Sequence, residues 1–207
     1  HCIPLGLPLN DLAPVTVEAR QWAESQWPAG QRRVLAVGRL SHYKGFNFLV
    51  ESAQLLPEAY CLIVGEGEMQ GELSAQIEAR NAGHRVRMTG RLPAAQLHAL
   101  LESCEVFCLP SVERTAAFGL VLVEAMARRK PLVACRIPGS GVGWVVKDGR
   151  NGLLAEPMNP GDLADKIRQA LDRPELGIEG FKRVNAEFSM DQVARQIKDV
   201  YLRVLNT

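Results

Sequence analysis

Two cations stand between two glycines in the stretch Gly38-Arg-Leu-Ser-His-Tyr-Lys-Gly45, directly after a short apolar run. The glycines allow the backbone to approach a ligand closely, and Arg39 and Lys44 can neutralise the charge of a phosphate group. A helical pattern starts at Gly45, and a helix N-terminus also favours an anion. The pattern suits a diphosphate, although for this loop taken alone a solvated loop with incidental charges is the simpler interpretation.

A second chemically suggestive stretch, residues 109–127, joins an apolar run to an apolar helical pattern that begins near Gly119. The amides of Phe118, Gly119 and Leu120 lie where a helix leaves its first N–H groups unpaired, as an anion site requires. Glu124 falls inside the apolar pattern, where an ionised carboxylate is costly unless it has a partner. We therefore predict a ligand or an ion pair for Glu124, unless this helix face is exposed to water.

Other polar residues give weaker signals. Glu66 follows an apolar run in Gly65-Glu-Gly-Glu68, where capping of the next helix is favoured over contact with a sugar hydroxyl. His42, His84 and His98 lack metal-ligand spacing, and the 5 cysteines lack paired spacing. We therefore expect no metal site, and scattered cysteines favour a reduced, intracellular protein.

Short apolar runs alternate with helical patterns along most of the chain. The runs are residues 34–37, 60–64, 86–88, 106–109, 132–135 and 153–154, and the helical patterns are residues 45–56, 69–79, 94–103, 119–129 and 162–171. Apolar runs without polar alternation indicate a parallel sheet that is covered on both faces. The pattern predicts a Rossmann-like, doubly wound α/β fold with a six-stranded parallel sheet. Ligands of such sheets bind outside the carboxyl ends of the strands, where the stretches described above lie.

Both ends of the chain carry further helical patterns, at residues 17–26, 175–187 and 190–205. The chain opens at His1 with a stretch typical of a linker, so we expect a segment of a longer protein. The net charge of +1 gives no general attraction to nucleic acid, and no apolar run is long enough to span a bilayer.

Four groups of motifs occur in a fixed order: Gly38-Arg39…Lys44-Gly45, Val64-Gly-Glu-Gly67, Pro110-Ser111…Phe118-Gly-Leu…Glu124-Ala-Met-Ala127, and Pro138-Gly…Asp148-Gly…Asn151-Gly-Leu153. Together they resemble the carboxyl-terminal domain of family 4 retaining glycosyltransferases. The resemblance implies one half of a GT-B fold, which binds a UDP- or GDP-sugar and transfers a hexose to a saccharide or lipid-linked acceptor. It assigns residues 1–30 to a linker from an amino-terminal acceptor domain, residues 31–174 to the nucleotide-sugar-binding domain, and residues 175–207 to helices that pack toward the missing domain. The chain by itself is then expected to be inactive.

The resemblance also implies a role for each matching residue. Arg39 and Lys44 match the pair that binds and stabilises the departing diphosphate, and Glu124 matches the glutamate that binds the ribose hydroxyls. The remaining donor-binding positions are Gly38 and Glu66, then Arg91 and Leu92 in the base-binding stretch, and Phe118, Gly119 and Leu120 at the sugar and phosphate. No Asp-x-Asp motif occurs, in agreement with metal-independent chemistry without a cofactor, in which cations and helix-end amides meet the developing charge.

One position departs from the family pattern. The first of two glutamates eight positions apart should stand at residue 116, where this sequence has Ala116. The chain was mutated, has diverged, or uses Glu113 instead. A shift of three residues rarely reproduces a donor site's geometry, so compensation by Glu113 is the weakest of these. We expect nucleotide binding to survive and sugar transfer to be reduced.

Several functions compete with a donor-binding enzyme half. Ala116 also fits a module that recognises nucleotide sugars without catalysis. A nicotinamide-dependent oxidoreductase is disfavoured because the first turn lacks Gly-x-Gly-x-x-Gly, and a flavodoxin-like regulator is disfavoured because no acidic cluster ends the early strands. By analogy with bacterial relatives we expect synthesis of cell-surface polysaccharide in the cytoplasm, with peripheral association of the whole protein at the inner membrane face. The base, the sugar and the acceptor stay open.

Overall fold

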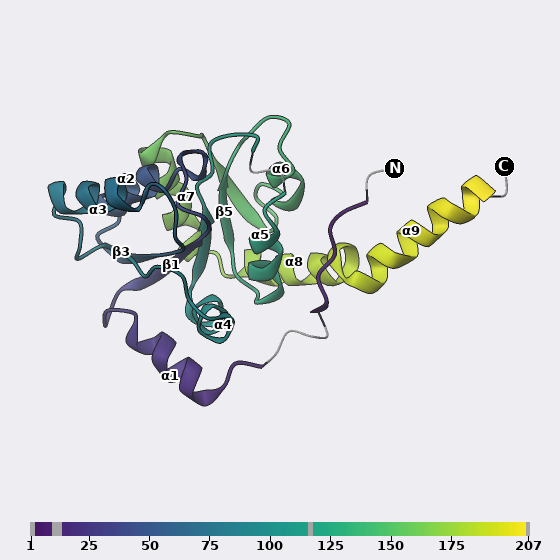
Figure 1. Cartoon of the computed structure of the whole chain (residues 1–207), viewed down its shortest axis with the longest axis horizontal. Coiled ribbons are helices and arrows are strands. Elements are labelled where there is room, and N and C mark those ends of the chain that lie inside the picture. The colour runs from purple at the N-terminus through teal and green to yellow at the C-terminus, as the bar shows by residue number, and fades with distance from the viewer. Residues whose placement is uncertain (1–2, 10–13, 116–117, 206–207) are drawn as a thin grey trace.

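The computed structural model describes residues 3–9, 14–115 and 118–205. Their strands are β1 Arg32–Val37, β2 Ala59–Val64, β3 Val86–Met88, β4 Val106–Leu109, β5 Leu132–Cys135 and β6 Gly152–Ala155 (Figure 1). Their helices are α1 Val17–Ser25, the 3-10 turn η2 His42–Lys44, α2 Phe46–Gln54, α3 Gln70–Ala79, α4 Ala94–Ser103, α5 Leu120–Ala127, α6 Val142–Val145, α7 Pro160–Leu171, α8 Glu175–Arg183, the π-helix η3 Val184–Phe188 and α9 Met190–Leu205.

The strands form one parallel, six-stranded sheet in the order β3-β2-β1-β4-β5-β6. The predicted Rossmann-like, doubly wound fold is therefore confirmed. The strand order reverses its direction between β1 and β4, which are hydrogen-bonded neighbours. A crevice for a ligand is expected outside the carboxyl ends of these two strands.

Alternate residues of each strand point to opposite faces of the sheet, and both faces are covered. Leu35 and its equivalents pack against α1, α4, α5 and α6, whereas Val34 and Ala36 pack against α2, α3 and α7. Val34, Leu35 and Ala36 have no solvent exposure. Burial on both faces explains why the strands are apolar without alternation.

The first thirty residues are not a simple extended linker. Helix α1 begins after Thr16, whose hydroxyl accepts a hydrogen bond from the Ala19 amide at 3.2 Å. The helix packs on α4, where Ala23 and Trp27 enter the core and the Trp27 indole donates to the Ser103 hydroxyl at 2.9 Å. Helix α1 therefore packs against the same core as the sheet. The domain boundary predicted at residue 30 stays a proposal.

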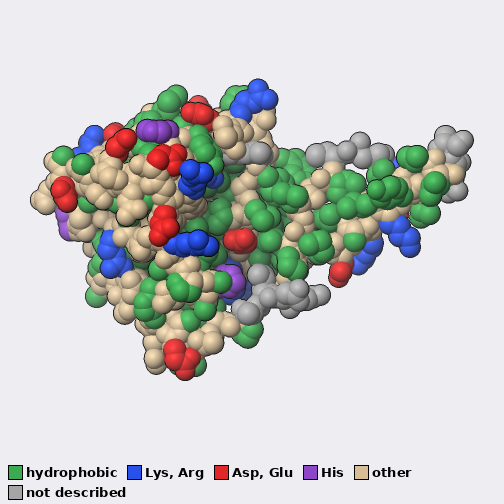
Figure 2. Space-filling model, in the orientation of Figure 1, with side chains coloured by type: hydrophobic (Ala, Val, Ile, Leu, Met, Phe, Trp, Pro, Cys, Tyr) green, Lys and Arg blue, Asp and Glu red, His purple; other side chains and the backbone are tan. Residues whose placement is uncertain are grey.

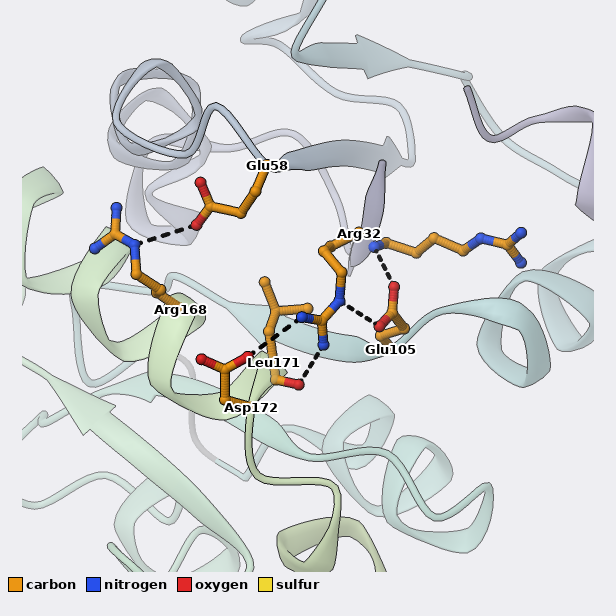
Figure 3. A network of polar contacts seen from close by, with 7 residues as sticks. Arg32, Glu58, Glu105, Arg168, Leu171 and Asp172 are labelled. Carbon is orange, nitrogen blue, oxygen red and sulfur yellow. Dashed lines mark hydrogen bonds and ion pairs between the residues drawn. The ribbon is translucent and has the colours of Figure 1, made fainter. Parts of the chain in front are cut away.

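A network of charged residues closes the amino edge of the sheet (Figure 3). Arg32 at the start of β1 pairs with Glu105 at 2.6 Å and with Asp172 at 3.3 Å, and Arg168 of α7 pairs with Glu58 at 3.1 Å. The network joins β1, the turn before β4 and the end of α7. It therefore stabilises the edge opposite the loops that were predicted to bind a ligand.

The carboxyl-terminal helices differ in part from the prediction. The helix expected over residues 175–187 is divided into α8 and the π-helix η3, and α9 then begins at Met190 as expected. Helix α9 projects from the body, and hydrophobic side chains gather along it (Figures 1 and 2). Its exposed apolar residues include Ile197, Tyr201 and Val204.

The cysteines within the described residues are buried and free. They are Cys61, Cys104, Cys108 and Cys135, and burial raises the pKa of Cys61, Cys104 and Cys135 to about 12. A thiol with so high a pKa stays protonated and is a poor nucleophile. These residues therefore act as small apolar core residues, as expected for Cys61, Cys108 and Cys135.

Candidate functional site

The loops that follow β1, β2 and β3 are hydrogen-bonded to one another at the carboxyl edge of the sheet. The Leu40 amide donates to the Glu66 carbonyl at 2.9 Å, and the Met69 amide donates to the Leu40 carbonyl at 3.0 Å. The Gly65 amide donates to the Gly90 carbonyl at 3.0 Å. Three stretches that are distant in sequence thus form one continuous rim.

The loop after β1 also contacts the loop after β4, across the point where the strand order reverses. The Val112 amide donates to the Tyr43 carbonyl at 2.9 Å. Gly45 adopts φ +66°, and a Cβ atom there would lie 2.2 Å from the Pro110 carbonyl oxygen. Only glycine permits this approach, so the Gly38–Gly45 loop is held beside the start of the β4 loop.

The two predicted diphosphate cations have different surroundings. Arg39 forms an exposed ion pair with Glu68 at 3.4 Å, and 73% of its side chain is accessible to solvent. Lys44 is half-buried, its stem lies beside Gly38, and its Nζ atom lies 5.2 Å from the centre of the Tyr43 ring. Burial lowers the pKa of Lys44. Among the described residues no carboxylate pairs with Lys44, so an anionic ligand would supply the missing counter-charge.

Glu124 lies half-buried on α5, within four residues of Arg128. Burial raises the pKa of Glu124, and the charge of Arg128 opposes this rise. The described residues give its carboxylate no hydrogen bond and no close ion pair. In place of the expected ion pair, Glu124 has only a longer-range attraction to Arg128. Its carboxylate is therefore available to accept hydrogen bonds from a ligand.

The turn before α5 enters the helix through a left-handed glycine without a side-chain cap. Gly119 stands directly before the helix with φ +78°, and the helix begins at Leu120. Within the described ranges, the amides of Phe118, Gly119 and Leu120 have no acceptor. Phe118 packs partly into the core, and Leu120 is exposed. These amides can therefore donate to an anion in the crevice.

The other predicted donor-binding residues occupy the same rim. Gly38 continues the β1 ladder through its amide, which donates to the Val64 carbonyl at 3.0 Å, and the Glu66 side chain is exposed. Arg91 is exposed, whereas Leu92 lines a pocket of about 260 Å³ with Trp22. Ala116 lies outside the described residues.

Ser111 is a site candidate that residue-by-residue prediction missed. It follows the end of β4, it is 1% exposed, and its hydroxyl has no hydrogen-bond partner among the described residues. An orphaned buried hydroxyl is unusual in a folded protein. Its place directly after a buried strand and its membership of the Pro110-Ser111 motif were the available signals, but nothing in the sequence showed that its hydroxyl would lack a partner.

The Asp148–Gly152 turn serves the structure instead of the site. The Asp148 carboxylate accepts from the Leu154 amide at 3.0 Å, and the Asn151 side chain donates to the Val145 carbonyl at 3.0 Å. The turn precedes β6 at the amino edge of the sheet. Within residues 3–9, 14–115 and 118–205, no cluster suited to a metal ion occurs, and no helix has the length and apolarity needed to cross a membrane.

The fold and the loops at its carboxyl edge define a Rossmann-like α/β domain of the GT-B type. A family model for Glycosyl transferases group 1 matches residues 18–179. The chain belongs to this family and is a glycosyltransferase group 1 domain.

Similar proteins agree with this assignment. An uncharacterized glycosyltransferase of Methanocaldococcus jannaschii is 32% identical over 170 residues, which cover 81% of this chain and 47% of the relative. Sucrose-phosphate synthase from Thermosynechococcus elongatus has a similar structure, with a TM-score of 0.80, 30% identity, and coverage of 99% of this chain and 52% of its own. The Anabaena protein HepE in complex with UDP-glucose has a TM-score of 0.80 and 26% identity, with coverage of 96% and 56%. The chain spans about half the length of these relatives.

Proposed function

We propose that this chain is the donor-binding domain of a retaining glycosyltransferase that takes a hexose from a UDP- or GDP-sugar. The observation that carries the proposal is Lys44, a half-buried cation without a carboxylate partner among the described residues, held beside the β4 loop. A diphosphate at this point would stabilise the charged form of Lys44, which burial disfavours. The relative that is solved with UDP-glucose supports this choice of ligand.

The other rim residues take complementary roles in this proposal. Arg39 exchanges its exposed pairing with Glu68 for the diphosphate, and the amides before α5 bind the phosphate and sugar. Glu124 accepts hydrogen bonds from the ribose hydroxyls. The remaining donor contacts come from Gly38 and Glu66, with Arg91 and Leu92 beside the base. As the glycosidic bond breaks, charge on the departing diphosphate is met by fixed cations and amides, without a metal or cofactor.

The chain's partners follow from the same proposal. The acceptor, a saccharide or a lipid-linked saccharide, binds an amino-terminal domain outside residues 1–207, so this chain is inactive alone. The exposed apolar residues of α9 are available to contact such a domain. The whole protein is proposed to act in cytoplasmic synthesis of bacterial cell-surface polysaccharide, with peripheral association at the inner membrane face.

A second candidate, a nucleotide-sugar-binding module without catalysis, rests on Ala116. Loss of the first glutamate removes a carboxylate beside the donor sugar, whereas the diphosphate contacts remain. Restoring the carboxylate by Ala116→Glu in the longer protein should raise turnover if the protein is an enzyme. Unchanged, negligible turnover in both forms would favour the binding module.

Titration calorimetry of the chain tests the proposed ligand. UDP or GDP should bind in the micromolar range, with one base clearly preferred, and NAD should not bind. Saturable binding of NAD and not of either diphosphate would favour an oxidoreductase and contradict the proposal. Chemical-shift changes confined to the loops after β1 and β4 would locate the ligand.

The Glu124→Gln substitution should weaken nucleoside diphosphate binding about tenfold, because one charged acceptor for the ribose is lost. The folded-state pKa of Glu124 lies above its unfolded value, so the stability that this group contributes at acidic pH is lost as the pH rises through the folded pKa. Glutamine cannot ionise, so Glu124→Gln avoids this loss of stability. The free energy of unfolding at pH 7 should therefore stay equal or rise.

Calorimetry and urea denaturation of Glu124→Gln measure both effects. Glu78→Gln, on the exposed surface of α3, is the matched control and should change neither. Unchanged affinity of Glu124→Gln would contradict the proposed ribose contact, and destabilisation at pH 7 would show that Glu124 has a structural role.

A further inference from the structure

Three aromatic rings connect Phe118 in the turn before α5, the donor loop of the proposed function, with the carboxyl-terminal helices. Phe118 lies 6.0 Å from Trp144 of α6 and 6.1 Å from Phe188, and Trp144 lies 5.4 Å from Phe188, between ring centroids. Both contacts of Phe188 have edge-to-face geometry, which aromatic pairs favour. The Phe188 side chain is completely buried. Phe118 therefore packs against Phe188, which lies 70 residues further along the chain.

Phe188 ends the π-helix η3 and is held by Arg183, the last residue of α8. The Arg183 guanidinium lies 5.2 Å from the centre of the Phe188 ring and pairs with Glu187 at 2.9 Å. The same guanidinium donates to the Trp144 carbonyl at 2.8 Å. Single-turn π-helices occur often at functional sites. Arg183, at the end of α8 and directly before η3, thus contacts the Phe188 ring and the backbone of Trp144.

The backbone of Phe188 is also the point where the two ends of the described chain meet. The Leu7 amide donates to the Phe188 carbonyl at 2.7 Å, and the Met190 amide donates to the Leu7 carbonyl at 2.9 Å. Residues 3–9 and helix α9 project from the same side of the body (Figure 1). A shift of this paired segment would move Phe188 and thus the ring that supports Phe118.

We propose that Phe188 is a positioning residue that transmits the position of the paired segments at Leu7 and Met190 to Phe118 in the donor loop. The effect on ligand affinity rests on the proposed function of that loop, whereas the mechanical link does not. When the Leu7–Met190 pair is in place, the amides before α5 are held in one arrangement, and donor binding does not have to order them. When the pair is displaced, the loop loosens and donor affinity falls.

The Phe188→Leu substitution tests the proposal, because leucine stays apolar and removes both edge-to-face contacts. Amide hydrogen exchange over residues 118–122 should become about tenfold faster, and UDP or GDP should bind about fivefold more weakly. Phe181→Leu is the matched control: Phe181 lies on α8 with a guanidinium, that of Arg129, 4.6 Å from its ring centre. It should leave both measurements unchanged.

A second variant, Gly6→Ala, leaves the three rings intact and crowds the paired segment. A Cβ at Gly6 would lie 3.1 Å from the Met190 Cα atom, so one of the two segments must shift. Exchange over residues 118–122 should rise in this variant too, and this result decides the proposal if Phe188→Leu does not fold.

The outcomes separate the two proposals. If the unmodified chain binds no nucleoside diphosphate, the proposed function fails, and the exchange data still test the link. If nucleotide binds but neither variant changes exchange over residues 118–122, or if Phe181→Leu changes it equally, the positioning role of Phe188 is wrong.

Discussion

Replacing Lys44 by methionine is expected to weaken the binding of UDP or GDP about 100-fold while the chain stays folded. A charge-assisted hydrogen bond to a phosphate group is lost, and the unbranched methionine fills most of the space of the lysine stem. The folded-state pKa of Lys44 lies below its unfolded value, so the charged side chain costs stability at neutral pH. Its removal should leave the free energy of unfolding at pH 7 equal or higher.

The pH dependence of binding distinguishes Lys44 from a general loss of charge. A bound diphosphate favours the protonated amine, so affinity should fall as the pH rises through the lowered pKa of Lys44, and this alkaline fall should be absent in Lys44→Met. Lys147→Met is the matched control, because Lys147 is half-buried and precedes β6 at the opposite edge of the sheet. If both substitutions weaken nucleotide binding equally, affinity depends only on the net charge of the chain. That result would contradict a specific contact between Lys44 and the diphosphate.

The Gly65→Ala substitution is expected to lower the free energy of unfolding by about 3 kcal/mol or more. Gly65 adopts φ +147°, a conformation that other residues rarely adopt, and a Cβ there would lie 1.9 Å from the Gly38 carbonyl oxygen. The alanine must push the β1 and β2 loops apart and strain the hydrogen bonds that join them. Because Gly38 begins the proposed diphosphate loop, the residual folded protein should also bind nucleotide more weakly.

Urea denaturation followed by circular dichroism measures this loss. Gly71→Ala is the control, since in the described part of the chain a Cβ at Gly71, in the first turn of α3, would have nothing within 4 Å apart from its own helix backbone and chain neighbours. Alanine at this helical position should raise stability by up to about 1 kcal/mol. A Gly65→Ala protein as stable as the unmodified chain would show that the two loops can separate freely, and the rim would not be the rigid site inferred here.

Much of the fold was predictable because its signals are local. Six apolar runs and the helices between them were located to within a few residues, since burial on both faces leaves strands uniformly apolar. The split of the predicted 175–187 helix into α8 and η3 was not visible, because a π-helix of a single turn is too short to give an apolar period of its own. The loops after β1 and β4 were placed correctly at one edge because parallel strands end at the same edge.

The contacts within the site were not predictable from local signals, because they depend on which strands are neighbours in the sheet. The partner of Arg39 is Glu68 from the next loop, and Tyr43 meets Val112 only because β1 and β4 are neighbours. Residue types and spacing show which side chains can bind a phosphate, but they do not show which of them already have partners. The lack of any partner for Ser111 in the described ranges was equally invisible in the sequence.

The amino-acid sequence by itself determined the alternation of strands and helices and the family, and it named the residues proposed to bind a diphosphate, because periodicity and motif order are properties of the chain alone. The tertiary structure alone decided that Lys44 is half-buried without a carboxylate partner among the described residues, and that Phe118 rests on Phe188. The physical reason is that burial and pairing are set by atoms from distant segments, which only the folded packing brings together.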